Sequence, residues 1–372
     1  MKFTIITHVP HVLENKQYYA YGPYVNEMNL WLKHVDEVIV CAPVSSTLRN
    51  PIDCAYEQEN LSLVTLQDFD IKSLSGIVKT MLKIPQNMLH IYRAMKRADH
   101  IHLRCPGNMG LLGCIVQILF PKKPKTAKYA GNWDPNSKQP FSYKLQKWIL
   151  SNTFLTRNMK VLVYGEWAGQ TANIYPFFTA TYSEADKQPI IEKNLGGKIK
   201  CLFVGTLSEG KRPLYAAEMV ASLLQSGYDV TLDYYGEGDQ KIILENYSTA
   251  HNLERQIRLH GNQPKAIIEH AYREAHFLIL PSKSEGWPKV IAEAMFWGCL
   301  PVATSVSCVP FMLNHGNGGI LLTLSLKRDK ARLQNYLSNP ALYRQQVLSA
   351  SEWSRKYTTD FFEQEIKVLL RP

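Results

Sequence analysis

Short apolar runs of β-type alternate with helix-length segments along the first half of the chain. After an amino-terminal strand, a polar loop is expected to last until about Tyr21, and Pro85 interrupts the longest predicted helix. Short strands separated by helices indicate crossover connections, and therefore a parallel sheet with helices on both faces. Strands are predicted over 3–9, 37–44, 61–66, 100–104, 125–131 and 160–165, and helices over 24–35, 77–98 and 109–120.

The second half repeats this alternation after a stretch without clear periodicity, residues 175–198. We therefore expect an α/β protein of two Rossmann-like doubly wound domains, whose sheets face a central ligand cleft with their carboxyl ends. The first domain is placed at 1–178, a linker at 179–197 and the second domain at 198–351, and a terminal helix over about 352–372 is expected to pack back on the first domain. Strands are predicted over 199–207, 230–236, 257–261, 276–282 and 300–304, and helices over 214–228, 242–253, 266–275 and 290–298.

Length and composition narrow the class of protein. With 372 residues and 45% hydrophobic content, the chain is long enough for two packed domains. Its seven cysteines form no C-x-x-C pair, which is typical of reduced thiols in an intracellular protein. The amino terminus lacks the features of a signal peptide, and the longest apolar run, residues 110–120, is shorter than the roughly 18–20 residues that span a bilayer. A cytoplasmic protein without a membrane-spanning helix is expected.

Positive charge is concentrated in one part of the chain. The net charge is +10, and between Lys79 and Lys160 there are fifteen Lys and Arg but two acids, Asp99 and Asp134. Such a basic region indicates an anionic partner, for example a membrane surface, a phosphorylated lipid or a nucleic acid. A solvated charged face explains the same charge equally well.

The stretch PSKSEGWPKVIAEAMFWGCLPVAT, residues 281–304, keeps two glutamates eight positions apart. Glu285 is predicted in the turn after a buried strand, Pro288 at the first position of the next helix, and Glu293 on that helix. The N–H groups of a first helical turn can hold phosphate oxygens, and carboxylates accept hydrogen bonds from sugar hydroxyls. This spacing suits a nucleotide sugar; the alternative is that Glu285 caps the helix and Glu293 lies on the surface.

This stretch resembles the E-x7-E donor-binding segment of the retaining GT-B glycosyltransferases of glycosyltransferase family four, the group 1 glycosyltransferases. Three further segments are similar to the family's motifs and fall in its order: FVGTLSEGKRP at 203–213, YYGEGD at 234–239, and the strand, helix and strand over 260–282. The resemblance extends over about 204–322 and covers the first half only in outline. It implies a GT-B fold and transfer of a sugar from a nucleotide diphosphate with retention.

The resemblance also implies roles for particular residues. Glu293 would bind the ribose hydroxyls, Glu285 the donor sugar, and Lys211 the diphosphate, where its charge offsets the leaving group. The implied catalytic residues are Glu285, Lys211 and Asn132. The expected donor-binding residues are Gly22, Gly205, Thr206, Lys211, Arg212, Gly236, Gly286, Trp287, Lys289, Val290 and Glu293.

Two positions depart from the family pattern. Thr206 stands where the family has an arginine, so Arg212 or a basic residue of the first half would have to supply that charge. Pro288 stands in place of a glycine and removes one backbone donor from the phosphate cradle. Gly22, in the loop after the first strand, would let the backbone approach the diphosphate, although a plain turn explains its Gly-Pro pair equally well.

In the family, the amino-terminal domain binds the acceptor, and the matching loop here is residues 129–140. Asn132 stands where many relatives carry a histidine; an asparagine orients hydroxyls without acting as acid or base, which fits a front-face mechanism in which the leaving phosphate takes the acceptor proton. Trp133 is a candidate for stacking on a sugar and Asp134 for acceptor binding, although an aromatic beside a strand end is also typical of a core. The expected membrane-docking residues, by resemblance to relatives with lipid-linked acceptors, are Lys122, Lys123, Lys125 and Lys128.

Several rival functions fit the sequence less well. Asp68 and Asp70 form a D-x-D, the metal signature of the other glycosyltransferase fold, but the two-domain pattern argues against it and no metal is assigned. A GT-B sugar-nucleotide epimerase would not need a basic first domain, a nucleic-acid-binding protein would leave the glutamate pair unexplained, and no G-x-G-x-x-G follows either first strand, as a dehydrogenase requires.

The sequence therefore predicts a metal-independent retaining glycosyltransferase of hexosyltransferase type, without a cofactor. Its substrates would be a nucleotide-sugar donor and a glycan or lipid-linked acceptor, in cell-surface polysaccharide or glycoconjugate synthesis. An anionic membrane surface is expected as a partner at the inner face of the membrane, and nucleic acid is not.

Overall fold

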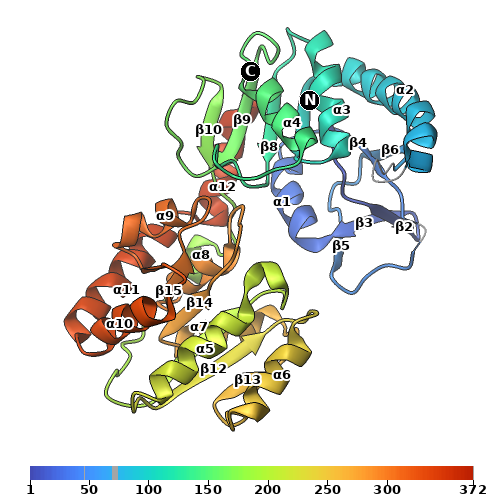
Figure 1. Cartoon of the computed structure of the whole chain (residues 1–372). Helices are drawn as coiled ribbons and strands as arrows, with labels where there is room; N and C mark the ends of the chain where they lie inside the picture. The colour runs from blue at the N-terminus through green and yellow to red at the C-terminus, as the bar shows by residue number, and fades with distance from the viewer. Residues whose placement is uncertain (46, 69–73, 372) are drawn as a thin grey trace. The chain divides into compact units, whose positions relative to one another are not determined.

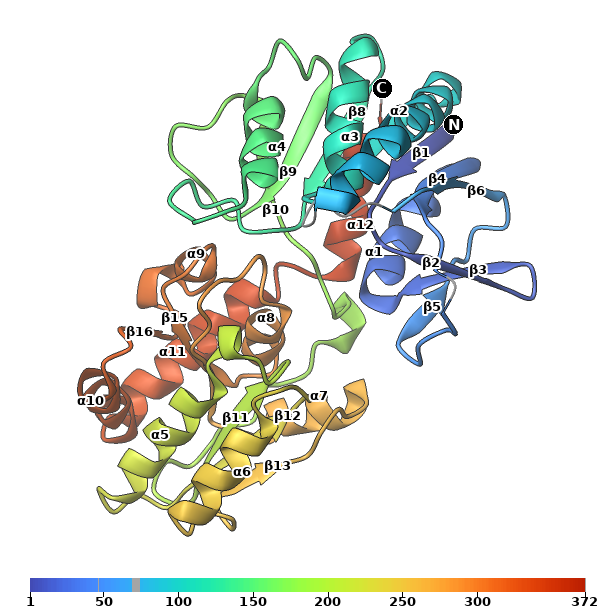
Figure 2. The same ribbon diagram turned by 45° about the vertical axis from the view of Figure 1, so that its right-hand side comes forward.

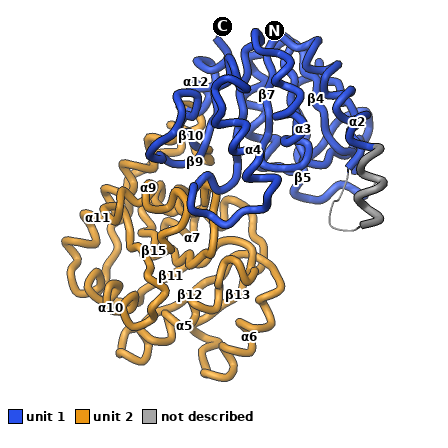
Figure 3. The backbone as a smooth tube through the Cα atoms, turned by 45° about the horizontal axis from the view of Figure 1, so that its top comes forward, with its two compact units in different colours: residues 1–178, 362–372 blue, residues 179–361 orange. Residues whose placement is uncertain are grey.

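The computed structural model describes residues 1–45, 47–68 and 74–371, with side chains described outside 69–82. The chain divides into two compact units (Figure 3). Unit 1 contains residues 1–178 and 362–372, and unit 2 contains residues 179–361.

Unit 1 is built on a parallel sheet with strand order β10-β9-β8-β7-β1-β4-β6 (Figure 1). Apolar β-branched runs make its central strands, and Ile5, Val40 and Val161 are fully buried in them. The strands are β1 Lys2–Ile6, β4 Glu37–Pro43, β6 Leu61–Leu66, β7 His100–Cys105, β8 Lys125–Tyr129, β9 Met159–Tyr164 and β10 Ile174–Phe177; the helices are α1 Gly22–Leu32, α2 Leu74–Arg97, α3 Asn108–Val116, η1 Gln117–Leu119, α4 Phe141–Ser151 and, from its residue 362 onward, α12 Thr359–Leu370.

Helix α4 was not predicted, and two strand features of unit 1 also differ from the sequence-based expectation. The polar stretch before Tyr21 forms a hairpin, and with a third strand it makes a small antiparallel sheet. Strand β10 includes the first residues of the stretch without clear periodicity, 175–198. It is an edge strand that pairs on one side only, and such a strand tolerates Pro176. The small sheet consists of β2 His11–Glu14, β3 Gln17–Tyr21 and β5 Asp53–Ala55.

Unit 2 repeats the doubly wound arrangement, with strand order β13-β12-β11-β14-β15-β16, all parallel. Helices α5 and α6 lie in front of strands β11 and β12 in Figure 2. The strands are β11 Ile199–Val204, β12 Val230–Tyr235, β13 Ile257–Leu259, β14 Phe277–Leu280, β15 Leu300–Thr304 and β16 Ile320–Leu322; the helices are η2 Glu184–Asp186, η3 Glu209–Lys211, α5 Pro213–Leu224, α6 Lys241–Ala250, α7 Lys265–Glu274, α8 Lys289–Phe296, α9 Val309–Met312, η4 Asn314–Gly316, α10 Leu326–Leu337 and α11 Pro340–Ser354.

Two helix boundaries correct the expectation. Pro288 is the N-cap of α8 rather than its first residue, so the helix begins at Lys289. The helix expected over about 352–372 is divided: α11 ends at Ser354, and α12 begins at Thr359, after Thr358 accepts a hydrogen bond from the Phe361 N–H at 3.3 Å. Among the described residues, no helix is both long and apolar enough to cross a membrane.

Candidate active site

Three loops of unit 2 meet at the carboxyl ends of β11, β12 and β14. The Gly205 N–H donates to the Tyr235 carbonyl at 2.9 Å, and the Leu207 N–H donates to the Glu237 carbonyl at 2.9 Å. The Lys283 N–H donates to the Gly210 carbonyl at 2.7 Å. The loops are therefore joined by backbone hydrogen bonds into one surface at the sheet edge where doubly wound folds bind ligands.

Glycine is needed at Gly236 because two backbones approach closely there. Its φ is 145°, and a Cβ on it would collide with the Gly205 carbonyl. The N–H groups of Gly205 and Gly236 are both bonded to carbonyls, of Tyr235 and Gly261 respectively. These two expected donor-binding glycines therefore shape the loop surface, and their own N–H groups are already used.

The centre of this surface is an ion pair between the two residues expected to be catalytic. Lys211 Nζ lies 2.5 Å from Glu285 Oε1, and the side chains are 29% and 7% exposed. A second, outer ion pair joins Lys283 and Glu209 across the same two loops. Lys211 is thus the open partner of a mostly buried carboxylate, and its charge remains accessible to a ligand.

Two residues that were not predicted as site residues stabilise the loop carrying Glu285 by hydrogen bonds. Thr304 Oγ1 donates to the Ser282 carbonyl at 2.6 Å, and Cys308 Sγ donates to the Gly286 carbonyl at 2.8 Å. Burial raises the pKa of the Cys308 thiol, so it keeps its proton and can donate. The available signal was the small polar run SVSC directly after the strand 300–304.

The side chain of Trp287, which belongs to the expected donor set, is mostly buried. It is 7% exposed, its ring stacks on Trp353 with centroids 6.0 Å apart, and its edge meets Tyr357 at 5.8 Å. Its apolar ring anchors the loop onto α11, which fixes the position of Glu285.

Glu293 lies half-buried on α8, and both of its oxygens accept hydrogen bonds. Thr181 Oγ1 donates at 2.8 Å, and the Tyr272 hydroxyl donates at 3.3 Å. Burial, and next the charge of Glu293, raise the pKa of Tyr272, which therefore stays a donor. Glu293 and Lys289 line a small cavity together with residues 179–182. The alternative of a plain surface residue does not fit these contacts, and the two hydroxyl donors had no sequence signal.

The remaining phosphate-site candidates of unit 2 lie on the same loops. Arg212 has a left-handed backbone, φ 49° and ψ 51°, an uncommon conformation for a non-glycine residue. Its Nη1 contacts the Pro281 carbonyl at 3.4 Å, while Thr206 is exposed. Lys289 and Val290 begin α8, so their N–H groups have no carbonyl partner within the helix.

In unit 1, the expected site residues of the loop after β8 form hydrogen bonds within that loop. Asn132 Oδ1 accepts the Asp134 N–H at 2.9 Å, and Asp134 Oδ1 accepts the Asn136 N–H at 2.8 Å. Lys147 Nζ donates to the carbonyls of Trp133 and Asp134, at 2.9 and 3.1 Å. Asn132 and Asp134 are therefore brought together, as parts of one hydrogen-bonded turn.

Trp133 corrects the expectation of a sugar-stacking platform. It is 3% exposed, belongs to the main apolar cluster of unit 1, and meets Tyr129 edge-on with ring centroids 4.8 Å apart. Its Nε1 donates to Gln170 Oε1 at 2.9 Å. The ring is core, and no face of it is open to a sugar.

Gly22 is also corrected. It is buried at the start of α1, its N–H donates to the Ile52 carbonyl at 3.1 Å, and a Cβ on it would collide with that carbonyl. The close approach that requires glycine is to this chain's own backbone, so Gly22 does not offer its N–H to a diphosphate.

The lysine cluster expected to dock on a membrane is largely buried. Lys125 is 2% exposed with Nζ donating to the Phe120 carbonyl at 2.8 Å, and Lys128 is fully buried with Nζ 4.5 Å from the Phe177 ring centroid. Lys123 donates to the carbonyls of Lys96 and Ala98, which leaves Lys122 as the exposed member of the four. Both buried lysines lie on β8, where the surrounding apolar run forms core rather than a docking face.

A pair of charges at the carboxyl edge of unit 1 was missed. Arg104 Nη1, on β7, lies 2.5 Å from Glu27 Oε1, with side chains 12% and 5% exposed, and its guanidinium lies over the Tyr24 ring. Nearby, His8 lies so close to Gly107 that a Cβ there would meet its ring. An arginine ending a strand and a histidine following one were the available signals.

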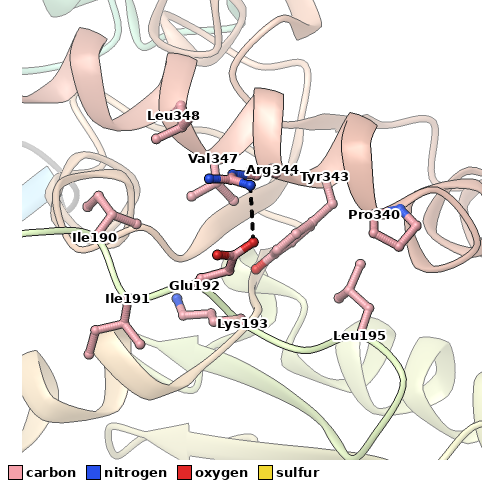
Figure 4. A pocket seen from close by; sticks show the side chains of 10 residues that line it. All are labelled: Ile190, Ile191, Glu192, Lys193, Leu195, Pro340, Tyr343, Arg344, Val347 and Leu348. Carbon is pink, nitrogen blue, oxygen red and sulfur yellow. Dashed lines mark ion pairs between the residues drawn. The ribbon is translucent and has the colours of Figure 1, made fainter.

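An apolar cavity in unit 2 shares no residue with the expected donor set. It lies between segment 190–195 and α11, where Arg344 Nη1 pairs with Glu192 Oε1 at 3.3 Å (Figure 4). No group of three potential His, Cys, Asp or Glu metal ligands occurs in the part of the chain that the structure describes. Of the rival D-x-D, Asp70 falls outside the described residues.

Known proteins resemble the chain over different lengths. Residues 185–352, less than half of the chain, match the family model of glycosyl transferases group 1. Protein CapJ of Staphylococcus aureus is 22% identical over 305 residues, which cover 77% of this chain and 74% of CapJ.

Among solved structures, HepE of Anabaena in complex with UDP and glucose matches with a TM-score of 0.71 and 13% identity, covering 100% of this chain and 99% of HepE. Sucrose-phosphate synthase of Thermosynechococcus elongatus matches with a TM-score of 0.66 and 16% identity, covering 99% and 98%. The predicted GT-B fold is confirmed, and the family match together with this fold supports a glycosyltransferase.

Proposed function

We propose that the protein is a retaining glycosyltransferase that moves a sugar from a nucleotide diphosphate to a glycan or lipid-linked acceptor, in cell-surface polysaccharide or glycoconjugate synthesis. The observation that carries this proposal is the Lys211–Glu285 ion pair on the carboxyl edge of unit 2, close in sequence to the amino terminus of α8. HepE, which shares the fold, is described in complex with UDP and glucose, which supports a nucleotide-sugar donor here.

In the proposed reaction, the donor diphosphate lies on the first turn of α8 and on Lys211. Lys211 leaves Glu285 for the more highly charged diphosphate, and Glu285 then accepts hydrogen bonds from the donor sugar. Glu293 exchanges its bonds from Thr181 and Tyr272 for bonds from the ribose hydroxyls.

The bond from the anomeric carbon to the phosphate oxygen breaks while the acceptor oxygen bonds to the same face. The acceptor proton passes to the leaving phosphate, and Asn132 orients the acceptor. Lys211, Arg212 and the helix amino terminus meet the growing negative charge, without a metal or cofactor.

The proposed function can be tested by screening nucleotide sugars with thermal-shift measurements and product analysis. One nucleotide class should raise the melting temperature of the protein. The anomeric configuration of the transferred sugar, read by NMR, should equal that of the donor. Inversion would contradict the retaining mechanism, and an epimerised nucleotide formed without acceptor would show an isomerase instead.

We also propose that unit 1 binds the inner face of the membrane, through α4 rather than through the buried lysines of β8. Phe141 and Trp148 are 80% and 60% exposed, and with exposed Lys144 they form one stripe at positions i, i+3 and i+7. Exposed aromatics beside a cation are typical of helices that lie in a membrane interface.

Sedimentation with phosphatidylglycerol vesicles tests the role of α4. Phe141→Ser/Trp148→Ser should weaken vesicle binding about tenfold, since two large apolar side chains leave the interface. Ile242→Ser/Ile243→Ser removes two exposed apolar side chains from α6 of unit 2 and should bind like the parent. Equal loss in both variants would assign the binding to general hydrophobicity.

A further inference from the structure

A large basic cavity lies at the amino-terminal edge of the unit 1 sheet, where β7, β8, β9 and β10 begin. Its volume is about 690 Å³, within the range of about 300–1,000 Å³ that is usual for small-molecule sites. The Asn132 loop follows the carboxyl end of β8, so the cavity lies at the opposite edge of the same sheet. The proposed reaction makes no use of it.

The lining of this cavity carries charge of one sign. Five basic residues line it, and among the described residues no aspartate or glutamate does. His100 adds no charge, because burial and next the neighbouring Lys160 lower its pKa to about 4. A concave wall of like charges focuses the field and attracts counter-ions. The basic residues are Lys122, Lys125, Arg157, Lys160 and Arg371.

One of these basic residues, Lys125, is buried. A basic surface that only contacts solvent would not need a buried lysine. Lys125 is 2% exposed, and its Nζ has a hydrogen bond to the Phe120 carbonyl at 2.8 Å. Burial lowers the pKa of Lys125 to about 8, so its charged form is destabilised in this position. A bound anion would offset that cost by pairing with the ammonium group.

The loops that carry the cations are tied to each other. The Lys125 N–H donates to the Asn158 carbonyl at 2.8 Å, and Asn158 Nδ2 donates to the Pro121 carbonyl at 3.0 Å. Asn173 Nδ2 donates to Thr156 Oγ1 at 3.0 Å, which joins the loop before β10 to the same wall. The cations are therefore presented from a preformed frame of neighbouring loops.

We propose that this cavity binds a soluble small molecule with two or more phosphate groups. Five cations without a lining acid exceed what one phosphate neutralises, and the volume leaves room for an organic part beside the phosphates. Phosphate oxygens accept hydrogen bonds from Arg and Lys in the geometry that these side chains offer. The site is distinct from the donor loops of unit 2, because all of its residues belong to unit 1.

Calorimetric titration with inorganic pyrophosphate, at constant ionic strength, tests this site. Arg157→Gln/Lys160→Gln removes two cations from the cavity and should weaken one class of pyrophosphate sites about tenfold or more. Arg93→Gln/Lys96→Gln, on the exposed side of α2, removes the same charge elsewhere and should titrate like the parent. Melting without ligand should be the same in all three proteins.

Two outcomes would overturn the proposal. If both double variants titrate like the parent, or if the parent shows no pyrophosphate site that the cavity variant weakens, the cavity is a solvated face. If the cavity variant instead loses binding to phosphatidylglycerol vesicles while pyrophosphate binding is unchanged, the phosphate belongs to a lipid surface. Binding at the donor loops does not affect this result, because Arg157 and Lys160 lie in unit 1 and that class of sites persists in every variant.

Discussion

Units 1 and 2 are built on the same kind of parallel sheet, yet the site residues that the sequence predicts at their carboxyl edges make different contacts. In unit 2, Lys211 and Glu285 come from separate loops and pair with each other at 2.5 Å. In unit 1, Asn132 and Asp134 bond to backbone within their own turn. The predicted residues of unit 2 therefore join two loops, whereas those of unit 1 stabilise a single turn.

One lysine of each unit shows a similar contrast. In unit 1, Lys128 is fully buried and bonded to the Phe178 carbonyl of its own unit. In unit 2, Lys211 keeps 29% of its side chain exposed beside a buried carboxylate. A count of lysines along the sequence therefore does not give the charge that a ligand meets.

The largest expected effect is a loss of stability when the buried Trp133 of unit 1 is replaced. Trp133→Ala should lower the free energy of unfolding by about 3–5 kcal/mol, because a fully enclosed ring leaves a cavity in unit 1. Chemical denaturation measures this. Trp148→Ala removes the same side chain from an exposed position of the same unit and should change stability by about 0.5 kcal/mol or less. A stable Trp133→Ala protein with defective acceptor binding would restore the stacking role.

The next largest effect is expected on kcat, when Lys211 of unit 2 is replaced. Lys211→Ala should lower kcat about 10²–10³-fold and change KM less, because its charge opposes negative charge that grows on the leaving diphosphate. Lys283→Ala, which breaks only the outer pair with Glu209, is the matched control and should stay near the parent. Steady-state kinetics with the cognate donor separate the two constants. A pure KM effect would make Lys211 a ground-state anchor.

Much of the fold was predicted from local sequence patterns. The parts that were not predicted depend on contacts between residues distant in sequence. Apolar runs and crossovers predicted both sheets, since buried parallel strands are nearly continuous in their hydrophobicity. The hairpin before Tyr21 was missed because its strands carry mixed polarity and depend on pairing with β5.

The candidate site shows the same limit. Motif spacing selected Lys211 and Glu285, which the structure pairs, whereas Trp133 and Lys128 were misread because burial is set by neighbours distant in sequence. Thr181, which meets Glu293 from 112 residues away, had no local signal at all.

A smaller effect is expected at the second glutamate. Glu293→Gln should weaken affinity for the cognate nucleotide about tenfold, since a neutral amide accepts ribose hydroxyls less well than a carboxylate. Glutamine keeps an acceptor for Thr181 or Tyr272, so the fold is not challenged. Glu269→Gln replaces a partly exposed carboxylate on α7 of the same unit, which pairs with Arg273 at 3.9 Å, and is the control. Equal calorimetric affinities in both variants would exclude Glu293 from the donor site.

The smallest expected effect is that of chelation. If Lys211, Arg212 and the first turn of α8 meet the diphosphate charge, no cation is needed there, and EDTA should leave the transfer rate within about twofold, because fixed positive groups replace the metal in stabilising the leaving group. The measurement is a rate with and without EDTA, on enzyme and substrates freed of divalent ions. A rate that falls with EDTA and returns with Mg²⁺ or Mn²⁺, but not with a monovalent salt of equal ionic strength, would place a metal in the reaction. Asp68→Asn and Asp70→Asn would then be the variants that decide whether the D-x-D of unit 1 holds it.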